Sequence, residues 1–357
     1  MRWKGIALMV GGTVGAGFLG IPYVVAKAGF GIGVLEIVLV GIITTLLALY
    51  TAEIIMLSKK HQLPSAVGKF LGGTGKHLMI ITLLIGLYGA LCAYSVGFGQ
   101  TLASMVGGEP LYYSIAFSLI AGMFVYRGLK IVSKSEVLLI GVLIPLFVVI
   151  TLYLTPKVEV SNITYVNPSM WALPFGVILF AFSSWTSVPE TILAVKRKIV
   201  RTVIESSIVI GLLYLVFTAA FVGAFGQDVS EVATNVMHGP IGVVANLLPL
   251  FTFTTSYLVL GLVVKDSLKE AYRLNNYQAW ILAILVPLAI VIFIKPTFID
   301  VLSIAALIAD TLAIILIGAA VIRARKTKEG IVSGGILLVI ITIVATLSGS
   351  IIALVMR

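Results

Sequence analysis

The chain has 357 residues, of which 60% are hydrophobic and 11% are charged, and its formal net charge is +10. Soluble domains carry about 25% charged residues, so this composition excludes an ordinary soluble protein and predicts a polytopic membrane protein. No polar stretch is long enough for a separate soluble domain, so we expect one domain over residues 1–357. A signal-peptide cleavage pattern is missing, and we expect an uncleaved first span.

Apolar runs predict eleven membrane-spanning helices, at residues 5–27, 31–58, 77–106, 110–128, 135–155, 170–194, 202–226, 240–264, 277–294, 297–322 and 331–355. With the N-terminus inside, all but four of the 24 basic residues fall in inner loops; the exceptions are Lys27, Lys157, Lys295 and Arg357. This positive-inside bias explains the net charge without a nucleic-acid partner. It predicts a cell-membrane protein with a cytoplasmic N-terminus and an external C-terminus.

The first predicted span is rich in glycine. Its middle carries Gly11, Gly12, Gly15, Gly17 and Gly20, followed by Pro22. Glycine leaves the backbone uncovered, and uncovered backbone inside a bilayer is costly unless it lines a cavity or contacts a ligand. The pattern therefore predicts a broken helix that forms a transporter's binding site. The alternative is a glycine face that lets neighbouring helices approach closely.

The sixth predicted span has a similar interruption, because Pro189 follows a hydroxyl cluster made of Ser183, Ser184, Thr186 and Ser187. Hydroxyl groups can satisfy the backbone groups that a break frees. Two broken helices five spans apart predict an inverted repeat, with repeats at about 5–155 and 170–322 and an extra helix at 331–355. The alternative is two unrelated polar helices in a bundle.

Broken helices offer charge without ionised side chains. The half-helix after Gly17 begins with free N–H groups at a positive dipole end, which suit a carboxylate. The carbonyl groups around Phe180 to Phe182, at the end of the other half-helix, suit an ammonium group. Together they predict a site for a zwitterionic amino acid, most simply a neutral one, with no cofactor.

The eighth predicted span carries hydroxyl groups on one face. Thr252, Thr255 and Ser256 are spaced i, i+3 and i+4 and therefore share that face. Hydroxyl and free carbonyl oxygens are hard ligands that suit a small cation. The alternative is that these hydroxyl groups bond to their own helix and only pack.

Few acidic residues lie in the spans, and Asp310 is the deepest of them. An acid inside the membrane is a candidate proton carrier or ion partner, and Asp310 and Glu36 are the candidate proton sites. Structural pairing is the favoured role for Glu36, Glu53 and Glu190, whereas both roles stay open for Asp310.

Four segments resemble one family of membrane proteins. They are residues 12–22 (GTVGAGFLGIP), 88–97 (YGALCAYSVG), 187–190 (SVPE) and 255–258 (TSYL). As a set they are similar to helices one, three, six and eight of the amino acid/auxin permease family and the related hydroxy/aromatic amino acid permeases. These belong to the amino acid–polyamine–organocation superfamily, and the likeness covers about residues 5–270.

The resemblance implies an amino acid transporter with a five-plus-five inverted-repeat fold. It implies that substrate contacts come from Gly12, Thr13, Gly15, Ala16 and Gly17 on the first span, from Phe180, Ala181, Ser183 and Ser184 on the sixth, and from Tyr94. In sodium-coupled relatives the cation lies between carbonyls that correspond to Gly11 and Val14 and hydroxyls that correspond to Thr255 and Ser256. Some proton-coupled relatives place a lysine of helix five there, and residues 137–154 contain no lysine.

Taken together, the sequence predicts a secondary transporter that moves amino acids by alternating access, coupled to a cation. Sodium is favoured, and a proton-coupled permease is the alternative. A membrane-embedded enzyme would need clustered acids or a metal-binding set, whereas the acids here are dispersed. A channel would need a continuous polar path, whereas polar residues concentrate at one depth.

Overall fold

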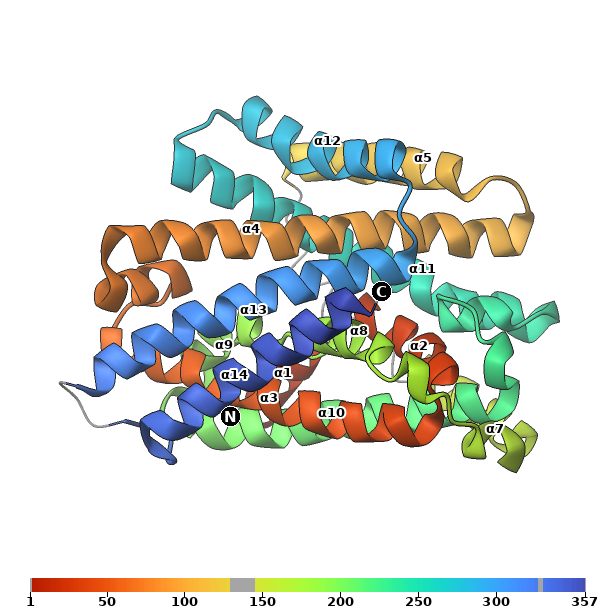
Figure 1. The fold of residues 1–357 in the computed structure, drawn as a ribbon. Helices are drawn as coiled ribbons and strands as arrows, with labels where there is room; N and C mark the ends of the chain where they lie inside the picture. The colour runs from red at the N-terminus through yellow and green to blue at the C-terminus, as the bar shows by residue number, and fades with distance from the viewer. Residues whose placement is uncertain (1, 129–144, 327–329, 357) are drawn as a thin grey trace.

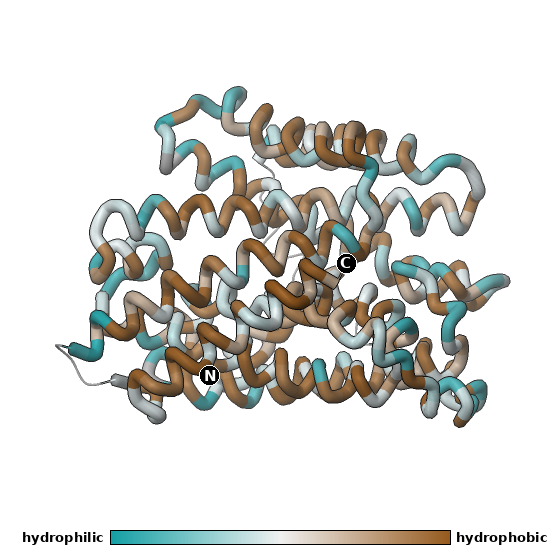
Figure 2. The backbone as a smooth tube through the Cα atoms, in the orientation of Figure 1, coloured by the Kyte–Doolittle hydropathy of each residue, from teal (hydrophilic) through white to brown (hydrophobic). Residues whose placement is uncertain are grey.

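The computed structural model of the chain describes residues 2–128, 145–326 and 330–356, and these residues are almost entirely helical (Figure 1). Among these residues, β-type pairing is limited to one isolated bridge between Gly29 and Val166. Figure 2 shows apolar residues along most of the long helices and polar residues mainly at their ends and in the loops. The prediction of an all-α polytopic membrane protein is therefore confirmed.

Among the described residues, eight helical segments are long and apolar enough to cross a membrane. They are α3 (Phe30–Ser58), α4 (Leu63–Val106), the segment Leu173–Val195, α10 (Ile199–Phe225), α11 (Gly239–Tyr272), α12 (Asn276–Ile294), α13 (Phe298–Arg325) and α14 (Gly335–Val355). The bent pair Trp3–Thr13 and Ala16–Ala28 makes a ninth if it is one span. Helix α5 (Pro110–Arg127) coincides with the fourth predicted span but is not among the eight.

The predicted count of eleven spans stays a prediction. Residues 135–144 of the fifth predicted span, 135–155, lie outside the described residues, and the described part belongs to a shorter apolar helix at Pro145–Lys157. The predicted repeats at 5–155 and 170–322 also stay a prediction. Two elements differ in length from expectation: α4 begins before a kink at Gly72, where φ is +77°, and α11 continues to Tyr272.

Helix α13 lies at the centre of the bundle. It packs against α4, α8 (Leu173–Ala181), α14 and α3, and Figure 1 shows it running between α4 and α14. Small residues permit these close contacts: a Cβ atom on Gly89 of α4 would lie 2.2 Å from Ala305 Cβ, and one on Gly176 of α8 would lie 2.0 Å from Ser303 Oγ. Membrane helices pack through such small residues.

The orientation of the chain is tested by cysteine labelling. The variant carries Cys92→Ala, so that the buried native thiol does not react, and a new cysteine at exposed Ser161 or exposed Lys198. The positive-inside bias predicts that an impermeant thiol reagent, applied to intact cells, labels position 161 and not position 198. Labelling of position 198 in sealed cells would contradict a cytoplasmic N-terminus.

Candidate functional site

The first span is broken in its glycine-rich middle. Helix α1 (Arg2–Thr13) ends before Val14, the short 3-10 helix η1 (Ala16–Gly20) follows, and α2 (Ile21–Ala28) begins with Pro22 in its first turn. The axis bends by 53° at this point. The N–H of Gly15 donates to Thr13 O at 2.7 Å, a tight local turn in place of a helical bond. The glycine pattern therefore predicted the break correctly.

The sixth span is broken in the same manner. Helix α8 ends at Ala181, the 3-10 helix η4 (Ser184–Ser187) follows, and α9 (Val188–Val195) begins with Pro189 in its first turn. The backbone N–H of Ser183 turns back to Phe180 O at 3.2 Å instead of continuing the α-helical pattern. Leu179 O, which the Ser183 N–H would reach in a continuous helix, accepts the Ser183 hydroxyl at 3.1 Å instead.

The two breaks lie against each other. A Cβ atom on Gly17 would lie 2.8 Å from Phe180 Cδ1 and 3.1 Å from Ala181 Cα, and one on Gly12 would lie 2.4 Å from Ser187 Oγ. The Tyr214 hydroxyl on α10 donates to Ala181 O at 2.8 Å and is 3.5 Å from Thr13 O. The carbonyl ends of α1 and α8 therefore meet at one tyrosine.

The glycines of the first break have different roles. Gly12 and Gly17 are required by the close approach of η4 and α8, which is the packing role that the sequence left open for them. Gly15 is different, because the nearest atoms to an added Cβ are Tyr94 Oη at 3.5 Å and Thr13 O at 4.0 Å. Gly15 is therefore the position where the bare backbone is not explained by a neighbouring helix.

The remaining predicted substrate residues differ in burial. Thr13, Ala16, Ala181 and Ser184 are buried, whereas Phe180 and Ser183 are half-buried. Tyr94 of α4 is 5% exposed, and its hydroxyl lies beside the Ser256 side chain. Gly12 and Thr186 are exposed although both lie at the breaks.

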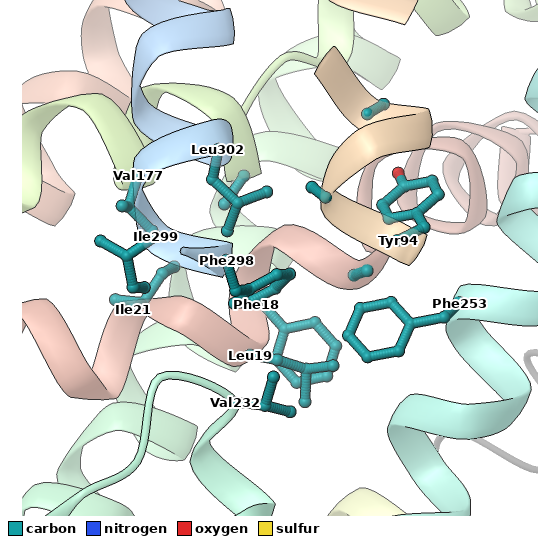
Figure 3. Packing of buried hydrophobic residues seen from close by; sticks show 14 of the residues in the cluster. Phe18, Leu19, Ile21, Tyr94, Val177, Val232, Phe253, Phe298, Ile299 and Leu302 are labelled. Atoms are coloured by element: carbon teal, nitrogen blue, oxygen red, sulfur yellow. The ribbon is translucent and has the colours of Figure 1, made fainter. Parts of the chain in front are cut away.

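Aromatic and aliphatic side chains pack around the first break (Figure 3). Phe253 packs edge-on against Phe298 with 5.6 Å between ring centres, and Val232 from the loop after α10 is fully buried beside Leu19. Glu231 holds this loop in place, because its Oε2 accepts from Gln100 Nε2 at 3.1 Å and from Phe298 N at 3.0 Å. These contacts pack the loop after α10 against the first break.

The hydroxyl groups of α11 donate to their own helix. Thr252, Thr254 and Thr255 reach the carbonyls four residues earlier at 2.7–2.8 Å. This is the local bonding that the sequence gave as the alternative to a cation site, although each hydroxyl keeps free lone pairs. Thr252 is fully buried, whereas Thr255 and Ser256 are half-buried. Helix α11 packs against η1, which begins at Ala16.

Asp310 lies directly beside the second break. The carboxyl group of this residue, which is 3% exposed, accepts the Ser183 hydroxyl on Oδ2 at 2.5 Å and the Trp185 indole N–H on Oδ1 at 2.7 Å. The sequence singled out Asp310 by its depth alone. It missed Trp185 as a partner, although an indole inside a cluster of hydroxyl residues could have been a signal for a buried acceptor.

The other acids have separate surroundings. Glu53 forms a buried ion pair with Arg325, as the structural role predicted. Glu36 is 7% exposed, and its Oε2 has no hydrogen-bond partner in the described part of the chain. Glu190 is exposed in the first turn of α9. No hydrogen bond among the described residues connects Glu36 to Asp310, so the structure does not join the two candidate proton sites.

The chain was compared with known sequences and solved structures. It is 24% identical to glutamine transporter 2 of Aliivibrio fischeri, over 91% of this chain and 89% of that protein. It is 25% identical to tyrosine-specific transport system 1 of Haemophilus influenzae, over 95% and 93%. Its fold matches that of MhsT, solved in complex with L-phenylalanine, with a TM-score of 0.69 at 13% identity over 100% of this chain and 98% of that one.

These relatives are transporters, which supports the prediction that the chain is a permease and not an enzyme. The sequence model of the tryptophan/tyrosine permease family matches residues 1–354, nearly the whole length. The resemblance read from the four segments is confirmed at the level of amino acid permeases. The protein is an amino acid transporter that belongs to the tryptophan/tyrosine permease family.

Proposed function

We propose that this protein is a sodium-coupled secondary transporter for neutral amino acids. The observation that carries the proposal is the meeting of the two broken helices, where the carbonyl ends of α1 and α8 converge on Tyr214. The relatives named above are described for glutamine and tyrosine, and MhsT was solved with L-phenylalanine. All three amino acids are uncharged in the side chain, which supports a neutral substrate here.

The substrate lies, in this proposal, between the two breaks and Tyr94. Its ammonium group contacts the carbonyl end of α8, and its carboxylate contacts the backbone N–H groups that follow Gly15. Gly15 leaves room for this approach, because Tyr94 Oη is the nearest side-chain atom. Alternating access moves α1, α2, α3, α8, α9 and α10 against α4, α5, α11 and α12.

The sodium ion lies between the Gly11 and Val14 carbonyls and the hydroxyl oxygens of Thr255 and Ser256. The two hydroxyl residues are half-buried, and α11 packs against η1, which begins two residues after Val14 in the chain. Because Thr255 donates its hydrogen to Phe251 O at 2.8 Å, its lone pairs can turn to a cation. Thr252 is the weaker candidate of the predicted set, because it is fully buried.

Sodium binding is expected to raise the melting temperature of the purified protein, because a ligand that binds only the folded state stabilises it. Potassium or choline at equal ionic strength should have no such effect. The double variant Thr255→Ala with Ser256→Ala should lose the sodium effect. Thr254→Ala is the matched control, because Thr254 bonds to its own helix in the same way but lies off the shared face.

Uptake into proteoliposomes tests the coupling itself. An imposed sodium gradient is expected to drive accumulation of the amino acid in wild-type protein and in the Thr254→Ala control, but not in the double variant. Uptake that follows a proton gradient alone in sodium-free buffer would contradict sodium coupling. Asp310 or Glu36 would then be the better candidate for the coupling site.

A further inference from the structure

The Ser183 hydroxyl lies within hydrogen-bonding distance of two acceptors but has one hydrogen to donate. Its oxygen lies 3.1 Å from Leu179 O and 2.5 Å from Asp310 Oδ2, and both of these atoms accept hydrogen bonds. A serine hydroxyl has one hydrogen to donate, so it cannot serve both acceptors when Asp310 is ionised. A bond to a charged acceptor is shorter and stronger than a bond to a neutral carbonyl. The ionised carboxylate therefore takes the hydrogen.

Among the residues that the structure describes, Leu179 O has no other donor in this arrangement. In a continuous helix the N–H of residue 183 would reach it, but Ser183 N donates to Phe180 O at 3.2 Å. The neighbouring carbonyls at the end of α8 do have hydrogen-bond donors. Ile178 O accepts from Phe182 N at 3.0 Å, and Ala181 O accepts from Tyr214 Oη at 2.8 Å. Leu179 O is therefore the carbonyl whose state depends on Asp310.

We propose that Asp310 is a proton-binding positioning residue that controls the carbonyl end of α8 through Ser183. When Asp310 is ionised, Ser183 donates to Asp310, and Leu179 O is left as an unpaired negative end of the half-helix. When Asp310 takes a proton from water, its new O–H donates to Ser183 Oγ, and Ser183 donates to Leu179 O. The binding of one proton thus neutralises the Asp310 carboxylate and gives Leu179 O, at the carbonyl end of α8, a hydrogen-bond donor.

Ser183 and Trp185, both in the second break, are the hydrogen-bond partners of the Asp310 carboxyl group. Helix α13 packs against α3, α4, α8 and α14. Helices α8 and α14 carry no ionisable side chain, whereas α3 and the membrane part of α4 carry Glu36, Tyr50, Glu53, Tyr88, Cys92 and Tyr94. The Asp310 carboxyl group is hydrogen-bonded to Ser183 and Trp185, and no hydrogen bond among the described residues joins it to any of these six side chains. Glu53 is already paired with Arg325.

Trp185 provides a direct optical readout. Its indole N–H donates to Asp310 Oδ1 at 2.7 Å, so a change in charge on the carboxyl group changes the electrostatic surroundings of the indole. The chain has four tryptophans. Trp3→Phe, Trp171→Phe and Trp280→Phe leave Trp185 as the only indole. We expect the emission of this protein in detergent to change with pH along a one-proton curve.

Two variants separate proton binding by Asp310 from the switch of the Ser183 hydrogen bond. Asp310→Asn should abolish the titration of Trp185 emission, whereas Ser183→Ala should keep it, because the bond from Trp185 to Asp310 remains. A flat emission curve over the pH range in which the protein stays folded would overturn the proposal. An unchanged titration in Asp310→Asn would overturn it as well. The reading with Asp310 intact needs only the three Trp→Phe changes, and thermal unfolding compares this protein with the wild type to show that it is folded.

The second readout is the affinity for an amino acid. This test rests on the proposed function, because it needs an amino acid that binds. The ammonium group of the substrate prefers ionised Asp310, so Kd should rise as pH falls, by up to about tenfold per pH unit, the limit for one competing proton. Ser183→Ala should weaken this dependence and Asp310→Asn should remove it. Tighter binding at low pH would contradict this switch of the Ser183 hydrogen bond. If no amino acid binds at all, the proposed function fails, and the emission curve still decides the proton site.

Discussion

The Gly15→Val variant is expected to lose amino acid binding almost completely while it folds and inserts normally. An added side chain at residue 15 meets no helix, since only Tyr94 Oη at 3.5 Å and Thr13 O at 4.0 Å lie near its Cβ. It therefore fills the space between the first break and Tyr94 that we assign to the substrate. A branched side chain there should exclude the ligand, and its Cβ atom makes no closer contact than 3.5 Å within the protein.

The matched control is Gly31→Val, because Gly31 is exposed on α3 and no atom lies within 4 Å of an added Cβ. Both variants should retain the melting temperature of the ligand-free wild type to within a few degrees. Radioligand binding to detergent-solubilised protein distinguishes them. Normal binding by Gly15→Val would mean that residue 15 does not face the substrate.

Glu53→Gln is expected to destabilise the ligand-free protein by about 3–5 kcal/mol, the usual cost of leaving one partner of a buried ion pair alone. Arg325 donates to both carboxylate oxygens, from Nε at 2.7 Å and from Nη2 at 2.8 Å. Glu53 Oε2 also accepts the backbone N–H of Val332 at 3.0 Å. The pair therefore ties α3 and α13 to the segment that leads into α14.

The control for this prediction is Arg323→Met. Arg323 is exposed, and its one side-chain hydrogen bond to the described residues goes to Phe70 O at 3.3 Å, so its removal should cost less than about 1 kcal/mol. Thermal unfolding followed by tryptophan emission compares the two variants. Equal melting temperatures for Glu53→Gln and Arg323→Met would show that the buried pair contributes little to stability.

Much of the fold follows from local sequence. Apolar length predicts most of the long helices, and the glycines before Pro22 and the hydroxyl residues before Pro189 place both breaks. These features act over a few residues, which is why they can be read from the chain. The depth of Asp310 in its span likewise marked it as a residue to consider.

The rest depends on partners far apart in the chain. The bond from Trp185 to Asp310 joins residues 125 positions apart, and the Glu53–Arg325 pair spans 272 positions. The sequence also could not separate Gly12 and Gly17, which pack against the second break, from Gly15, which does not. Periodicity alone gave Thr252 the same weight as Thr255, and only packing shows that Thr252 is fully buried.

The most direct test of the account is a thermal-shift screen of the purified protein against the twenty amino acids, in sodium and in potassium. We predict that one or more neutral amino acids raise the melting temperature, more strongly in sodium, and that Gly15→Val loses this rise while Gly31→Val keeps it. No stabilisation by any amino acid in either salt, or equal stabilisation of Gly15→Val, would contradict a substrate site between the two broken helices.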